Sequence, residues 1–273
     1  MRSSSNPAFR NLPRGGTATY GPPVGFDPYQ PGGPVSAGAG DRPMTVDDVV
    51  VKTGISLGVA LLTGVITALW AQAQLVTTAG RAGMTGALLG VMFGALIVGF
   101  VLSLVLIFKR SPSGPLTLAY SAAEGVFLGA LSGVFEVVYP GIALQAIIGT
   151  AGVFIGMLVV YKTGAVKVTP KLTKWIIGAM VGVGVLMLVN LITWAFFGFN
   201  PLRNGGPLAI VFSLVCIGIA AFSFLLDFDQ ADRMIREGMP SKWAWYAAFG
   251  LMTTLVWLYL EILRLLWMLQ SDN

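Results

Sequence analysis

The chain has no histidine, a single cysteine and few charged residues. The lack of histidine excludes histidine-based zinc sites, Ser-His-Asp triads and histidine pH switches. Cys216 lies in an apolar run and has no second cysteine with which to form an intrachain disulfide. Only 11% of the residues are charged and 55% are hydrophobic, whereas soluble domains contain roughly 25% charged residues. These values exclude a soluble globular enzyme and indicate a polytopic membrane protein.

Seven long apolar runs follow one another along most of the chain. Each has roughly 20 residues or more, which is enough for an α-helix to cross a hydrocarbon core about 30 Å thick. The sequence therefore predicts an all-α membrane domain over residues 47–273, with seven transmembrane helices in a lipid bilayer. The predicted spans are Val49–Trp70, Met84–Phe108, Pro115–Val138, Gly141–Tyr161, Trp175–Phe197, Leu208–Leu226 and Trp243–Leu269.

Residues 1–46 have a different composition, with eight prolines, eight glycines and no apolar run. This composition is typical of disorder, and it lacks the apolar stretch of a signal peptide. We therefore expect a disordered cytoplasmic tail over residues 1–46. At its end, Thr45 and Asp48 have the spacing that caps the start of a helix.

The basic residues predict the orientation of the chain. With seven crossings, 14 of the 17 lysines and arginines fall on one side of the membrane. The positive-inside rule makes this side cytoplasmic, so the N-terminus is expected in the cytoplasm and the C-terminus outside. This topology accounts for the net charge of +5, and we expect no nucleic-acid partner.

Glycines recur every four residues in the second, third and fourth predicted spans. This spacing places them on one face of each helix, and small residues on a face allow a neighbouring helix to approach closely. We expect close packing within one bundle, with a dimer interface as the alternative, and we favour a monomer. The glycines are Gly86, Gly90 and Gly94, then Gly125, Gly129 and Gly133, then Gly152 and Gly156.

Apart from Glu136 at the outer end of the third span, four acidic side chains lie within or at the end of the predicted spans. Glu124 is about 13 Å into the third span, at 1.5 Å per residue. A charge there costs about 2.5–3.5 kcal/mol on insertion scales, so its side chain must face the bundle interior or water. Asp227 and Asp229 end the sixth span and point in different directions. Glu261 precedes Arg264 by three residues, which predicts an ion pair within one helix, with a pore-lining role as the alternative.

No combination of residues typical of a membrane enzyme is present in the sequence. Its one Gly-x-Gly-Asp sequence, Gly38-Ala-Gly-Asp41, lies in the Pro/Gly-rich tail, whereas intramembrane aspartyl proteases carry this element within the membrane. The histidines of metalloproteases and a glycine-rich phosphate loop are absent. We therefore expect no enzymatic activity and no cofactor. Isolated intramembrane carboxylates indicate movement of protons or cations, and calcium prefers such oxygen ligands.

Three motifs occur in a characteristic order: Tyr120-Ser-Ala-Ala-Glu-Gly-Val-Phe-Leu-Gly129, Phe224-Leu-Leu-Asp-Phe-Asp-Gln230 and Ile262-Leu-Arg-Leu-Leu266. In this order they resemble the Bax inhibitor-1-like, or transmembrane Bax-inhibitor-motif, family over residues 47–270. The Pro/Gly-rich tail is similar to that of its actinobacterial branch, and this similarity implies a location in a bacterial plasma membrane. The resemblance implies a seven-helix fold whose last helix is central and wrapped by the other six. It also implies a pH-sensitive calcium leak controlled by a pair of aspartates on the sixth and seventh helices.

Asp227 matches the first aspartate of that pair. Aligning the last span on its Leu-Arg-Leu-Leu end places Thr254, or Thr253, at the second position. Aligning it on Leu258-Tyr-Leu-Glu261 places Glu261 there, at a longer spacing from Asp227, and we favour the first alignment. Residues 254 and 261 share one helix face about 10 Å apart, so that Glu261, or Glu124 from another height, is a candidate replacement for the missing acid.

The predicted function is a pH-sensitive cation leak, with calcium as the transported ion. Asp227 and Glu124 are the candidate cation or proton site, and Glu261, Arg264, Asp229 and Thr254 are candidate gating or pore-lining residues. One alternative is a non-conducting regulator that binds another membrane protein, such as a quality-control protease or a stress-response partner. The other is a small-solute transporter, which inverted repeats and broken helices would support.

Overall fold

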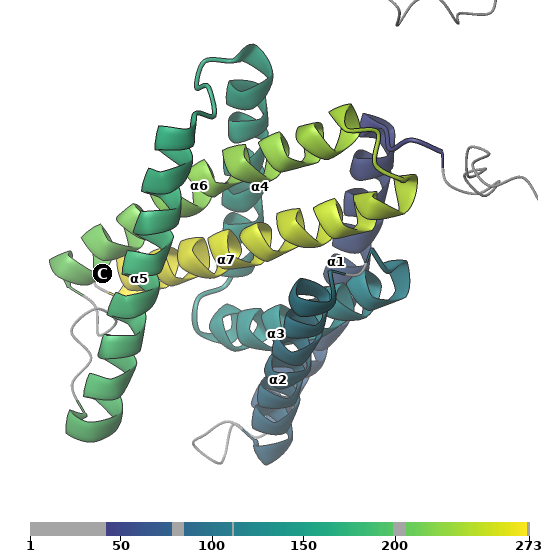
Figure 1. Ribbon diagram of the computed structural model, residues 1–273. Helices are drawn as coiled ribbons and strands as arrows, with labels where there is room; N and C mark the ends of the chain where they lie inside the picture. Colours follow the sequence, from purple (N-terminus) through teal and green to yellow (C-terminus); the bar gives the residue numbers. More distant parts are fainter. Residues whose placement is uncertain (1–41, 78–84, 111, 199–205, 272–273) are drawn as a thin grey trace, which may run out of the picture. The chain divides into compact units, whose positions relative to one another are not determined.

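Seven long helices and no β-strand occur in the residues that the computed structural model describes, which are 42–77, 85–110, 112–198 and 206–271. Nothing is described of the side chains of residues 194 and 197. All seven helices are long and apolar enough to cross a membrane, which confirms the all-α polytopic prediction. They are α1 (Val46–Thr77), α2 (Gly86–Lys109), α3 (Gly114–Val138), α4 (Ile142–Thr163), α5 (Pro170–Phe197), α6 (Pro207–Arg236) and α7 (Ala244–Ser271) (Figure 1).

The sixth helix is longer than the sequence predicted. The prediction ended this span at Leu226 and placed the following charged residues in a loop, whereas α6 continues to Arg236. Its last turns contain ion pairs with i,i+4 spacing, in which Asp229 pairs with Arg233 and Asp232 with Arg236. Such pairs support a helix outside the hydrocarbon core. Hydropathy detects only the part of a helix that lies within lipid, so the prediction missed the polar extension.

The last helix is central. Of the seven spans, α7 is buried to the greatest extent, and it packs against α1, α3, α4 and α6 (Figure 1). The central last helix that the resemblance implied is confirmed. Helix α2 packs mainly against α3, and α5 mainly against α6. Four helices therefore form the principal surroundings of α7, with α2 and α5 added on the outside.

The glycines of α3 allow α1 and α3 to pack backbone to backbone. A methyl group added at Gly129 would lie 2.8 Å from the Cα atom of Gly64, and one added at Gly125 would lie 2.8 Å from the Cα atom of Ala60. At Gly133, the added group would lie 2.7 Å from the carbonyl oxygen of Ala68. No real side chain tolerates such distances, so only glycine permits this approach. The predicted packing groove on the third span is confirmed.

The same prediction is wrong for α2 and α4. A methyl group added at any of the predicted glycines of these two helices would meet no atom within 4 Å; they are Gly86, Gly90, Gly94, Gly152 and Gly156. A four-residue spacing places glycines on one face, but it does not determine whether another helix of the same chain covers that face.

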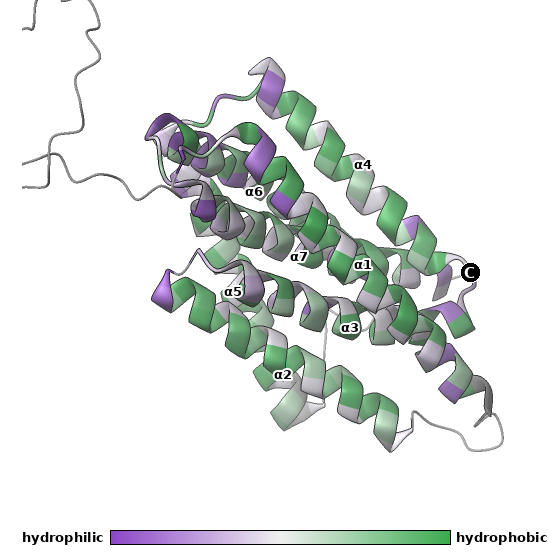
Figure 2. Ribbon diagram, turned by 90° about the vertical axis from the view of Figure 1, so that its right-hand side faces the viewer, coloured by the Kyte–Doolittle hydropathy of each residue, from purple (hydrophilic) through white to green (hydrophobic). Residues whose placement is uncertain are grey.

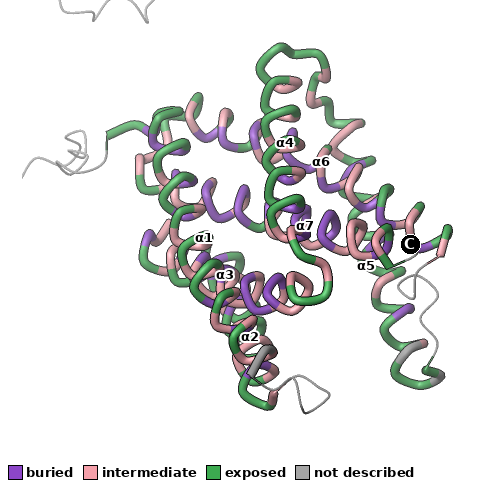
Figure 3. Tube along the Cα trace, turned by 180° about the vertical axis from the view of Figure 1, so that it is seen from behind, coloured by how far each residue is buried: buried purple, intermediate pink, exposed green. Residues whose placement is uncertain are grey.

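The outer surface of the helices is apolar. Hydrophobic residues predominate along the helices (Figure 2), and much of each helix is exposed (Figure 3). Large side chains such as Leu62 on α1, Ile97 on α2, Ile148 on α4 and Val181 on α5 are more than half exposed. Soluble monomers rarely expose contiguous apolar surface of this kind. The helices are therefore embedded in a lipid bilayer, and the chain is a multi-pass membrane protein.

Candidate functional site

A hydrogen bond joins α6 to α7 at Asp227. The hydroxyl of Thr254 donates to Oδ2 of Asp227 over 2.6 Å, and both residues are half-buried. Gly250 lies one turn before Thr254 on α7, and a methyl group added there would be 4.0 Å from Oδ1 of Asp227. The small residue leaves room for the carboxylate against α7. Thr254 therefore faces Asp227, as the favoured alignment predicted.

Aromatic rings pack on α6 around the turn that carries Asp227. Phe224 and Phe228 stack with their centroids 6.0 Å apart, and Phe154 of α4 meets Phe224 edge to face at 5.3 Å. Tyr161 of α4 packs on Phe228 at 5.6 Å. Residues one and three positions away from Asp227 thus bind α6 to α4, while Asp227 itself contacts α7.

Glu124 lies on a different side of α7. A methyl group added at Gly99 of α2 would be 2.9 Å from Oε1 of Glu124, so this carboxylate lies against α2. Tyr120, one turn earlier on α3, interacts with Glu124 and forms a 3.3 Å hydrogen bond with Thr253 of α7. Thr253 and Thr254 are adjacent, so their side chains point about 100° apart around α7. Glu124 therefore contacts α2 and Tyr120, whereas Asp227 contacts Thr254 of α7, so the two acids have different partners.

Glu261 and Arg264 form the predicted ion pair within α7. Oε2 of Glu261 lies 2.7 Å from an Arg264 guanidinium nitrogen, and their side chains are only 4% and 11% exposed. From α6, Ser213 hydrogen-bonds to Glu261, and the Phe212 ring lies 5.7 Å from the Arg264 guanidinium carbon. Thr254 and Glu261 thus both contact α6, as their shared helix face predicted, but at separate positions. Glu261 lies with Arg264 and Ser213, away from the contact between Asp227 and Thr254.

Asp229 faces away from Asp227. Its carboxylate pairs with Arg233 at 2.6 Å near the polar end of α6. One turn further, Asp232 pairs with Arg236 and accepts a 3.2 Å hydrogen bond from Tyr161 of α4. Asp229 is therefore part of a row of charges at the end of α6, and the sequence correctly placed it in a different direction from Asp227.

The segment before α1 is bound to the turn between α6 and α7, which the sequence did not indicate. The backbone N–H of Met44 donates to Met239, and that of Ser241 donates to Arg42. The predicted cap is present: Thr45 and Asp48 exchange hydrogen bonds at the start of α1. The predicted tail lies outside the described residues except for its last five positions, 42–46, which are ordered here. The proline-rich composition hid this contact, because hydrogen bonds to a distant turn leave no local pattern.

No three acidic or cysteine side chains among the described residues come together as a potential metal site. The contacts between Tyr120 and Thr253 and between Ser132 and Tyr259 were also missed by sequence reasoning. Single hydroxyl groups on apolar helices are common, and only the packing of α3 against α7 identifies their partners.

The family of the chain follows from a comparison with protein-family models. The model described as Bax inhibitor 1 like matches residues 6–271. The chain belongs to the Bax inhibitor 1 like family. A comparison with curated proteins finds no match.

In this Bax inhibitor 1 like chain, a carboxylate faces a hydroxyl at the α6–α7 contact. The sequence resemblance implied two carboxylates there. Two carboxylates at such a distance repel each other when both are ionised, whereas Thr254 donates a hydrogen bond to Asp227 over 2.6 Å. The hydrogen bond between Thr254 and Asp227 therefore involves one titratable group, the Asp227 carboxylate.

Proposed function

We propose that this chain is a pH-sensitive cation leak of the bacterial plasma membrane, with calcium as the transported ion and the contact between Asp227 and Thr254 as its gate. The observation that carries the proposal is the 2.6 Å hydrogen bond between these side chains, which links α6 to the central helix α7. The family and the seven apolar helices support a membrane function. The orientation proposed here, with a cytoplasmic N-terminus, rests on the distribution of basic residues.

The gate responds to pH through the charge of Asp227. An ionised carboxylate accepts a hydrogen bond about twice as strong as a neutral one does. Ionised Asp227 therefore holds α6 against α7, and protonation weakens this bond. Cation flux is expected to rise as the pH falls through the range in which Asp227 takes up a proton.

Weak cation binding is consistent with conduction. Calcium takes 6–8 oxygen ligands at a tight site, whereas the contact supplies one carboxylate and one hydroxyl. A conducting site must bind its ion weakly enough to release it. We propose that a passing cation meets Asp227 at the α6–α7 contact when this residue is protonated and binds cations weakly. Glu124 is proposed as a separate proton-binding group between α2 and α3.

Liposomes that contain purified protein and an internal calcium dye test the proposal. The wild type is expected to leak more at acid than at neutral pH. Thr254→Val is expected to leak more at neutral pH because Asp227 loses its donor, and Asp227→Asn is expected to lose the pH dependence. Thr163→Val is the matched control, since this exposed threonine bonds only within α4.

A flux that is unchanged when Asp227→Asn and Glu124→Gln are combined would refute the role of these acids. No flux from the wild type at any pH would refute conduction itself. The same assay therefore distinguishes a wrong assignment of the gating residues from a wrong assignment of the function.

The second candidate is a non-conducting regulator that binds another membrane protein. It is favoured by the separate contacts of the intramembrane acids, because Asp227, Glu124 and Glu261 each have different partners. Deletion of residues 1–41 tests it, since this deletion keeps the bonded segment 42–45. If the deleted protein conducts ions normally but no longer restores function in cells, the regulator is favoured. If function in cells is lost only in variants that keep the tail and lose ion flux, the leak is favoured.

A further inference from the structure

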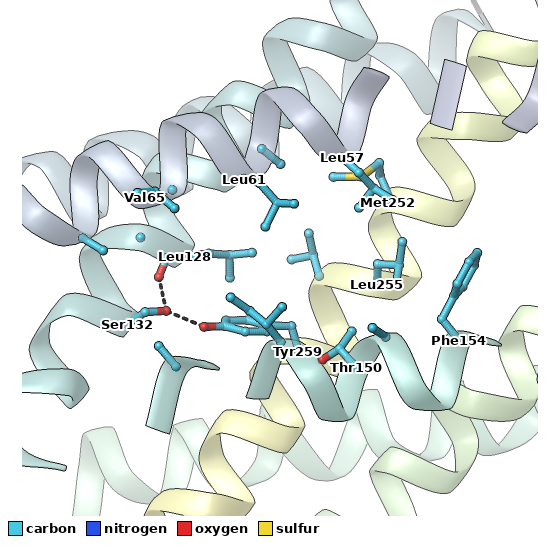
Figure 4. Close-up of a pocket in the computed structure, with 18 residues that line it drawn as sticks. Leu57, Leu61, Val65, Leu128, Ser132, Thr150, Phe154, Met252, Leu255 and Tyr259 are labelled. Carbon is cyan, nitrogen blue, oxygen red and sulfur yellow. Dashed lines mark hydrogen bonds between the residues drawn. The ribbon is translucent and has the colours of Figure 1, made fainter. Parts of the chain in front are cut away.

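A pocket of about 330 Å³ lies between α1 and α4, with α3 and α7 behind it (Figure 4). It is partly open, and exposed apolar side chains border it: Leu61 and Val65 on α1 and Ile147 on α4. All of its walls belong to membrane-spanning helices. The pocket therefore opens toward the bilayer.

The pocket contains no charged side chain. It is lined by aliphatic and aromatic groups and by three hydroxyls, those of Ser132, Thr150 and Tyr259. None of the acids discussed above lines it, so the pocket is separate from the proposed cation gate. A cation would have no counter-charge in it, and an anion would have no basic partner.

Each hydroxyl in the pocket already donates its proton in a hydrogen bond within the protein. Ser132 donates to the carbonyl oxygen of Leu128 over 2.6 Å, and it lies 2.7 Å from the Tyr259 hydroxyl (Figure 4). Because a serine has one hydroxyl proton, Tyr259 must be the donor in this second bond. Thr150 donates to the carbonyl oxygen of Ala146 over 2.8 Å. The pocket thus offers no free donor to a carbonyl, phosphate or carboxylate, and an apolar occupant suits it best.

The shape of the pocket favours an extended hydrocarbon chain over an α-helix as its occupant. On α1, the lining residues run from Leu57 to Ala68, and on α4 from Ala143 to Phe154. Each stretch rises about 16 Å, at 1.5 Å per residue. This length matches one leaflet, since half of the hydrocarbon core is about 15 Å. About 330 Å³ over that length is a narrow space, which suits a single hydrocarbon chain better than an α-helix about 10 Å wide.

We propose that this pocket binds one hydrocarbon chain of a membrane lipid, inserted lengthwise between α1 and α4. The hydrocarbon chain supplies dispersion contacts that the lining side chains would lack if the pocket were empty. The pocket is too apolar to hold ordered water in its place. Its volume and lining are those of a small-molecule site. The Ser132 and Tyr259 hydroxyls are structural, because they join α3 to α7.

Photolabelling in liposomes tests the proposal. The probe is a phosphatidylcholine with a diazirine in one acyl chain, diluted into unlabelled phosphatidylcholine and activated around the full-length protein. Labelled residues are mapped by mass spectrometry. Labelling of the pocket faces of α1, α4 and α7 is expected to exceed that of the outer faces of α2 and α5 several-fold.

Variants that fill the pocket sharpen the test. Ala151→Phe, from α4, is expected to reduce pocket labelling several-fold, and Ile147→Trp at the border is a second variant in case the first does not fold. Ala87→Phe is the matched control, because Ala87 is exposed on α2 and lies outside the pocket. Equal labelling of the pocket and the outer faces, or labelling unchanged by both filling variants, would overturn the proposal.

A further variant tests the chemical class of the occupant. Tyr259→Phe removes the hydroxyl and keeps the ring, so labelling by the acyl chain is expected to stay at the wild-type level. A several-fold loss in this variant would show that the ligand is anchored by a polar group. That result would overturn the assignment of a hydrocarbon chain.

Discussion

The α1–α3 and α6–α7 interfaces are held together by different kinds of contact. Between α1 and α3, Gly125, Gly129 and Gly133 bring two backbones together. Between α6 and α7, side-chain hydrogen bonds join the helices, from Thr254 to Asp227 and from Ser213 to Glu261. The first interface depends on the absence of side chains, and the second depends on particular polar ones.

This difference separates a fixed part of the bundle from a part that can respond to its surroundings. The close contacts of α1 with α3 involve no titratable group, so pH leaves them unchanged. The α6–α7 contacts include two carboxylates, whose hydrogen bonds change with protonation. Helix α7 packs against α6 and also against α1 and α3, so it can move in response to a change at α6 while α1 and α3 keep their geometry.

The largest expected effect tests the fixed part. Gly129→Ala places a methyl group 2.8 Å from the Cα atom of Gly64, and we expect a loss of about 3 kcal/mol or more in unfolding free energy. Gly152→Ala is the control, since nothing lies within 4 Å of the added group, and alanine favours a helix over glycine by up to about 1 kcal/mol. Reversible unfolding in bicelles measures both. Equal effects of the two substitutions would contradict the described α1–α3 contact.

The next effect concerns the buried ion pair of α7. Glu261→Gln removes the charge opposite Arg264 at a pair that is nearly fully buried, and we expect a loss of about 3 kcal/mol. Asp229→Asn is the matched control, because Arg233 is 63% exposed and such pairs contribute about 1 kcal/mol or less. Combining Glu261→Gln with Arg264→Met should restore much of the loss. A double variant as unstable as the two single losses added together would contradict the pairing.

A smaller effect is expected at the proposed gate. Thr254→Val removes the hydrogen bond to Asp227, and we expect a loss of about 1 kcal/mol, in the range of side-chain hydrogen bonds between membrane helices. The loss should be larger at neutral pH, where Asp227 is ionised, and smaller in acid. A double-mutant cycle with Asp227→Asn measures the coupling. Zero coupling at neutral pH would show that the contact does not hold α6 to α7.

The smallest effect concerns the segment bound to the α6–α7 turn. Arg42 pairs with Asp48 at 2.7 Å, but the arginine side chain is 62% exposed. We expect Arg42→Ala to cost about 0.5 kcal/mol, and less at high salt, because surface pairs are screened. Thermal unfolding at two salt concentrations measures this. A loss of stability in Arg42→Ala that is large and independent of salt would mean that the Arg42 side chain stabilises the protein by packing and not by its charge.

The sequence predicted much of the fold and only part of the candidate site. The number and order of the helices, the cap at Thr45 and the ion pair of Glu261 with Arg264 depend on nearby residues, so local patterns reveal them. The length of α6 was wrong because charged residues beyond Leu226 lower the hydropathy without ending the helix. The different partners of Glu124 and Asp227 could not be predicted, since they depend on how each helix is rotated about its axis.

By itself, the sequence determined that this protein crosses a bilayer seven times, because hydropathy and run length act within each segment. Only the tertiary structure decided which glycines pack, why Gly129 meets α1 while Gly90 and Gly152 meet nothing, and which side chain faces Asp227. The physical reason is that helical periodicity determines which residues share a face. The partner of that face is determined by the packing of the whole bundle.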